Sequence, residues 1–179
     1  MVASKAARKL KLYEALELRS EFDARIKTLK DCLPEAKENR GWLRSLRDAE
    51  QRRPSSDYDL DGARDAVRRL ELKRRKLNGA IQHANFKHQV EYGGDTITLS
   101  EALETRKSLN EAIGELHSLV VESAWQRVIY KEDRDIVEEN EASYTDCVER
   151  LDKARLDFRE LNRKLRAATF EVSVDFRDE

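Results

Sequence analysis

Cysteine, glycine and aromatic residues are scarce in this sequence, and the few cysteines and glycines lack the patterns of several known kinds of site. The two cysteines, Cys32 and Cys147, form no Cys-x-x-Cys pair and no framework of spacings, so we expect free thiols in a reducing compartment. The glycines form no phosphate-binding loop and no Gly-x-Ser-x-Gly elbow. Gly93-Gly94 is typical of a hairpin turn.

Long hydrophobic runs are also absent. The longest are a few residues, far below the roughly 20 that a membrane-spanning helix needs, so no membrane span is expected. The segment from Met1 to Leu12 carries four basic residues with no apolar region behind them, which is not the pattern of a signal peptide. We therefore expect a cytoplasmic protein.

The histidines favour no metal site. His83 and His88 are five residues apart, which places them on different faces of a helix rather than at the i, i+4 spacing of helical metal ligands. No Glu-x-x-His pair of the di-iron type occurs. We predict no catalytic residue, no metal and no cofactor, so the protein is not expected to be an enzyme.

What the chain has is charge, in both signs. Charged residues make up 40% of the sequence, with a net charge of −1. Without periodicity this composition would indicate disorder, but the sparse apolar residues recur at spacings of three and four, which is typical of helices with one buried face. The near-neutral balance argues against a dedicated nucleic-acid binder. We expect an elongated helical structure with much solvated surface.

The apolar stripes predict the order of the elements. A short Gly-Gly hairpin joins the two most regular stripes. Asp57 or Asp59 is the expected N-cap of the helix before the hairpin. Thr98 to Glu101 reads as a capping box at the start of the helix after it. Strict alternation from Phe170 to Phe176 predicts a strand. The expected elements of one domain, 1–179, are helix 5–33 with a continuation at 35–50, loop 51–58, helix 59–88, hairpin 89–98, helix 99–125, connector 126–138, helix 139–168 and strand 170–176.

These elements predict a mainly α fold, an elongated antiparallel four-helix bundle. In an up-down-up-down arrangement the end of the last helix lies at the same pole as the 89–98 hairpin. The strand 170–176 can therefore add to that hairpin as a third strand, which a marginal two-stranded ribbon needs. Within the 126–138 connector, Val128-Ile129-Tyr130 reads as a short extended segment.

Three blocks of the sequence resemble a known family. They are Thr98-Leu-Ser-Glu-Ala-Leu-Glu-Thr-Arg106, Ile81-Gln-His-Ala-Asn85, and Leu151-Asp with Phe158-Arg-Glu-Leu-Asn162. They are similar to a family of small bacterial helical proteins, some of whose members carry the label septicolysin. The resemblance covers most of the chain from Leu12 to Ala168, and departs from the family at Gln82 and in a longer 125–140 connection. The family has no established activity, so it implies no catalytic residue.

A run of basic residues is the strongest electrostatic signal. Six cations and one acid lie between Arg68 and Lys76, and this basic face could follow a phosphate backbone. Its candidate contact residues are Arg68, Arg69, Lys73, Arg75 and Lys76. The alternative is a solvated helix face, or pairing with the acidic stretch 132–141. We favour that alternative, because no aromatic residue interleaves with the run to stack bases.

Two arginines occupy positions where the stripes call for an apolar residue. Arg74 and Arg106 would need carboxylate partners if buried, and Glu101 or Glu104 could meet Arg74 across the helical hairpin. We interpret the four as a buried polar layer that fixes helix register. The alternative is a pocket for a small anion between helices.

Helix 99–125 supplies the leading functional hypothesis. Its apolar arc is wide for a helix that touches one neighbour, so the helix either lies at the centre of a bundle or reaches another subunit. An exposed sheet edge could also pair with its copy in another chain. We predict a non-enzymatic interaction or scaffold protein whose partner is itself, as a homo-oligomer, or another protein. Nucleic-acid or polyanion binding through the basic face is the second hypothesis.

Overall fold

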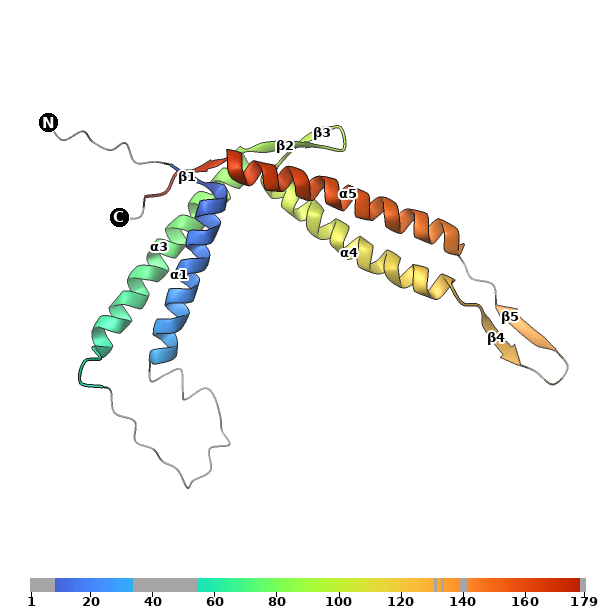
Figure 1. Ribbon diagram of the computed structural model, residues 1–179, viewed down its shortest axis with the longest axis horizontal. Coiled ribbons are helices and arrows are strands. Elements are labelled where there is room, and N and C mark those ends of the chain that lie inside the picture. The colour runs from blue at the N-terminus through green and yellow to red at the C-terminus, as the bar shows by residue number, and fades with distance from the viewer. Residues whose placement is uncertain (1–8, 34–54, 131, 133, 139–141, 178–179) are drawn as a thin grey trace, which may run out of the picture. The chain divides into compact units, whose positions relative to one another are not determined.

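The computed structural model describes residues 9–33, 55–130, 132, 134–138 and 142–177 (Figure 1). In these ranges the chain forms four helices and three antiparallel strand pairs, so the prediction of a mainly α fold with small sheet elements is confirmed. The described chain divides into two compact units. Unit 1 is built from 1–84 and 171–179, and unit 2 from 85–170. The expected helical continuation at 35–50 lies outside the described residues.

Unit 1 is an antiparallel pair of helices, α1 (Leu12–Cys32) and α3 (Leu60–Lys87). Apolar side chains at spacings of three and four face each other, and this burial supplies the main stabilisation of the pair. Leu77 is fully buried at its centre, and Phe22 is 2% exposed opposite α3. The other buried members are Leu12, Ala15, Ile26, Ala63, Val67, Ile81 and Ala84.

Both helices of unit 1 start at a hydrogen-bonded cap. The backbone N–H of Lys11 donates to Glu14 Oε2 over 2.7 Å at the start of α1. Asp59 is the N-cap of α3, because its carboxylate accepts a 3.0 Å bond from the N–H of Gly62. The first helix was expected to begin near residue 5, but residues 10–11 are extended, and residues 5–8 lie outside the described part of the chain.

The C-terminal strand corrects one expectation. Strand β6 (Ser173–Val174) pairs with β1 (Leu10–Lys11), and not with the 89–98 hairpin. The N–H of Leu12 extends the ladder by donating to the carbonyl of Val172 over 2.9 Å. Val174 is fully buried. The extended residues before α1 supply a free edge, which satisfies the backbone groups of the terminal strand.

Unit 2 begins with the predicted hairpin, β2 (Gln89–Tyr92) and β3 (Asp95–Thr98). Gly93 and Gly94 have φ values of 65° and 90°, so the turn uses the left-handed backbone that glycine adopts without a Cβ clash. The Nζ atom of Lys164 donates to the carbonyl of Glu91 over 2.6 Å and ties the hairpin to the following helix pair.

The long helices of unit 2 are α4 (Leu99–Ser123) and α5 (Tyr144–Glu171). The predicted capping box is present at α4, where Glu101 N donates to Thr98 Oγ1 over 3.2 Å and Thr98 N donates to Glu101 Oε2 over 2.7 Å. These bonds from Thr98 hold the pKa of Glu101 below its usual range. The buried residues of the unit are Leu99, Ala102, Cys147, Leu151, Leu161, Leu165 and Ala168.

The expected 126–138 connector contains a second β-ribbon. Strand β4 (Arg127–Tyr130) pairs with β5 (Asp135–Glu138) in antiparallel register. Val128-Ile129-Tyr130 is therefore a strand, as its extended reading suggested. The partner strand was not anticipated, because the charged residues 131–135 hide the short apolar pair Ile136-Val137 from a periodicity search.

Candidate interaction surfaces

The basic face predicted on α3 lies in unit 1 and is partly neutralised there. Arg68 forms an exposed ion pair with Asp65 over 3.5 Å. Lys73 also has an interaction partner. Within the described residues no ion pair involves the other three members, Arg69, Arg75 and Lys76.

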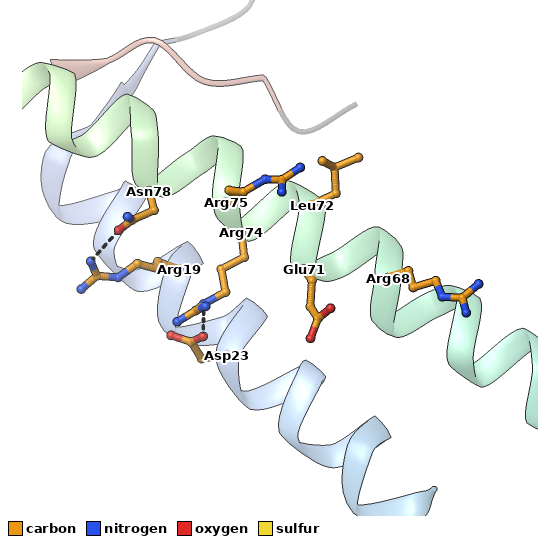
Figure 2. Close-up of a pocket in the computed structure, with 8 residues that line it drawn as sticks. All are labelled: Arg19, Asp23, Arg68, Glu71, Leu72, Arg74, Arg75 and Asn78. Atoms are coloured by element: carbon orange, nitrogen blue, oxygen red, sulfur yellow. Dashed lines mark hydrogen bonds and ion pairs between the residues drawn. The ribbon is translucent and has the colours of Figure 1, made fainter.

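An open groove of about 720 Å³ lies between α1 and α3 beside this face (Figure 2). Figure 2 shows Arg74 reaching across to Asp23 of α1, with which it forms an ion pair, and Arg19 reaching Asn78 over 3.4 Å. Glu71 pairs with Lys30 over 2.5 Å. The groove therefore brings its own carboxylates to its arginines, which weakens its attraction for an external anion.

The predicted buried polar layer is wrong. Arg74 pairs with Asp23 in unit 1, and its side chain is 50% exposed. Arg106, Glu101 and Glu104 lie in unit 2, and all three are exposed. Because all four residues are exposed, their charged groups reach water and the cost of burying them does not arise. Glu101 is engaged in the cap of α4.

Several large apolar side chains are exposed at the end of unit 2, where α4 ends and where β4, β5 and the start of α5 lie (Figure 1). Trp125 is 80% exposed and Tyr130 79% exposed. We call this the distal surface and define it by five exposed residues, Trp125, Val128, Tyr130, Val137 and Tyr144. A groove of about 540 Å³ opens between 123–126 and 142–144 within it. Exposed tryptophan and tyrosine are enriched at protein interfaces.

The β4–β5 ribbon carries apolar residues on both of its faces. Val128 is opposite Val137 on one face, and Ile129 is opposite Ile136 on the other. Side chains alternate along a strand, and continuous apolar runs are typical of strands covered on both sides. Here Ile129 and Ile136 are half-buried, and both valines are exposed. The ribbon thus has more apolar surface than unit 2 covers.

Neither surface has the features of a metal centre or a membrane span. Within the described part of the chain, no three His, Cys, Asp or Glu side chains are grouped to hold a metal ion. No described helix combines the length and apolarity needed to cross a bilayer.

Comparison with known proteins identifies the fold and no activity. The chain is similar to a solved structure of a functionally unknown conserved protein from Corynebacterium diphtheriae, with a TM-score of 0.68 and 17% sequence identity. The similarity covers 94% of this chain and 100% of the other. No family model and no curated protein matches the sequence. A shared fold alone does not carry a function, and nothing here supports the septicolysin label.

Proposed function

We propose that this protein is a non-enzymatic helical interaction protein that associates with a second copy of itself through the distal surface. The observation that carries the proposal is the β4–β5 ribbon, a two-stranded sheet with apolar residues on both faces. A lone two-stranded ribbon is marginally stable in water. Pairing with an identical strand would add backbone hydrogen bonds and cover the exposed valines.

A second copy fits this surface better than an unrelated partner does, for two reasons. Both strands of the ribbon have an unpaired edge in the described structure, and antiparallel pairing of like edges obeys the two-fold symmetry of most homodimers. The aromatic side chains of Trp125 and Tyr144 border the groove beside the ribbon, where they supply rigid apolar area for the same contact.

Sedimentation over a wide concentration range tests this proposal. We expect the wild-type chain to form a dimer, and Val128→Lys with Val137→Lys to make it monomeric, because a charge on the ribbon opposes edge pairing. The matched control is Leu72→Lys with Leu156→Lys. These residues are 43% and 56% exposed, against 39% and 49% for the two valines, but they belong to helices α3 and α5 and not to the ribbon.

Two results would overturn self-association at this surface. One is a wild-type chain that sediments as a monomer at every concentration. The other is an equal loss of dimer in the ribbon variant and in the control variant. Circular dichroism of all three proteins shows whether the helices are retained.

A further inference from the structure

Helix α5 carries a row of arginines that the count of charges along the sequence did not reveal. Arg155, Arg159, Arg163 and Arg166 follow one another at spacings of four, four and three, which places them along one stripe of the helix. We call this stripe the arginine ridge. All four are exposed, and they border an open groove of about 550 Å³ whose floor includes the half-buried Phe158 and Asn162.

The arginine ridge has little internal charge compensation. Arg155 forms an exposed pair with Asp152 over 3.3 Å, whereas within the described residues no ion pair involves the other three arginines. No carboxylate lines the groove. This differs from the groove between α1 and α3, whose lining includes Asp23 and Glu71.

Two acids of α5, Asp157 and Glu160, lie on a different side of the helix from the ridge. Asp157 and Glu160 are close enough to Tyr92 of the hairpin that burial and their negative charge raise the pKa of that phenol. Glu160 also pairs with Lys164 over 3.0 Å. The hairpin thus covers the acidic side of α5, and the ridge is left with a locally positive field.

This arrangement costs helix stability. Arg155 with Arg159, and Arg159 with Arg163, are like-charge pairs at i, i+4, and like-charge pairs at this spacing destabilise a helix. A helix face that is only solvated would alternate acids with bases four residues apart, as α5 does where Glu160 pairs with Lys164. Sequences that are unfavourable for the local structure are commonly found at functional sites, where particular side chains are needed for the function.

We propose that the arginine ridge binds single-stranded nucleic acid through its phosphodiester backbone. Guanidinium groups bind phosphate oxygens in a bidentate manner and also stack on bases. Phe158 supplies an aromatic surface in the floor of the same groove, and this combination is typical of sequence-tolerant single-strand binding. Arg166 lies eleven positions after Arg155 on the helix, so the ridge extends about 16 Å, the length of about five stacked nucleotides.

Fluorescence anisotropy with the full chain and labelled oligo(dT) and oligo(U) of about twelve nucleotides tests the site. Four phosphate contacts predict that the logarithm of the affinity falls with the logarithm of salt concentration with a slope of about −2.8. Arg159→Gln with Arg163→Gln is expected to reduce that slope by about 1.4 and to weaken binding at least about tenfold at 0.1 M salt.

Three matched variants locate the binding. Arg150→Gln with Lys153→Gln removes two positive charges from α5 outside the ridge and is expected to change affinity less than about twofold. Arg69→Gln with Arg75→Gln removes two from α3 and should also have little effect. Phe158→Leu keeps an apolar side chain and is expected to weaken binding about fivefold or more, because stacking is lost.

Several results would overturn the assignment. They are no binding at about 50 mM salt, equal losses in the ridge variant and either charge control, or unchanged affinity in Phe158→Leu. Equal competition by inorganic polyphosphate or by duplex DNA would likewise reject single-stranded nucleic acid as the ligand. The dimer proposed above uses the distal surface and not these arginines, so sedimentation tests it separately and the two proposals can fail independently.

Discussion

Two glycines of α3 are expected to respond differently to substitution by alanine. Gly79 is exposed, and a Cβ added there meets nothing within 4 Å. Gly79→Ala should therefore stabilise unit 1 by about 1 kcal/mol, the usual helix-propensity gain. At Gly62 an added Cβ would lie 2.3 Å from Oδ2 of Asp59. The carboxylate must move, and its 3.0 Å bond from the N–H of Gly62 would be lost.

The magnitude at Gly62 follows from two opposing terms. The propensity gain is at most about 1 kcal/mol, and loss of an aspartate N-cap costs typically about 1 kcal/mol. Gly62→Ala should therefore be nearly neutral. In an Asp59→Ala background the cap is already absent, so Gly62→Ala should become stabilising. The coupling between the two substitutions is expected to be about 1 kcal/mol.

Urea denaturation followed by far-UV circular dichroism measures the stability of the wild type and of four variants. These are Gly79→Ala, Gly62→Ala, Asp59→Ala and the double variant Asp59→Ala with Gly62→Ala. Both glycines lie in the same helix and unit, so one unfolding transition reports on both. Equal stabilisation by Gly62→Ala and Gly79→Ala, or a coupling free energy of zero, would refute the assignment of Asp59 as the N-cap of α3.

Two further predictions concern the cores and a cap. Leu77 is fully buried, so Leu77→Ala should destabilise unit 1 by about 2–5 kcal/mol. Leu72 is 43% exposed, so Leu72→Ala should change the unfolding free energy of unit 1 by less than about 0.5 kcal/mol. Similar losses at both positions would contradict the described packing. The lowered pKa of Glu101 means that its cap contributes stability above the ordinary value of 4.5 and loses it as pH falls through the lowered pKa. The stability difference between wild type and Thr98→Ala should shrink in that acid range, and an NMR titration of Glu101 that shows an unshifted pKa would contradict it.

The sequence predicted features that depend on neighbouring residues. The capping box at Thr98 and Glu101 and the Gly93-Gly94 turn are encoded within four residues, and the structure has both. The helices α3 and α4 begin and end within two residues of their expected bounds, because a stripe at spacings of three and four determines a helix without knowledge of its partner. The helices α1 and α5 begin later than the expected residues 5 and 139. The candidate N-cap was narrowed to two aspartates, and the bond to Gly62 selects Asp59.

Pairings between distant residues were harder to predict. The terminal strand was assigned to the hairpin because an up-down-up-down order of helices places both at the same pole, whereas its partner is the two-residue segment Leu10–Lys11. Two residues show no period, so a search by alternation cannot find them. Arg74 was placed in a buried layer because its stripe position was read as interior. Its partner Asp23 lies 51 positions earlier on the face of another helix.

The arginine ridge shows why charge counts along the sequence missed the better candidate site. The basic face of α3 was noticed because its six cations occupy nine consecutive positions, but consecutive positions on a helix point in all directions. Part of that charge meets Asp23 and other nearby carboxylates. On α5 the acids Asp157 and Glu160 interrupt the stretch from Arg155 to Arg163, and only the spacing of the four arginines brings them to one side. Counting charges at the period of a helix, rather than in consecutive positions, distinguishes arginines that can act together on a ligand from charges that neutralise one another.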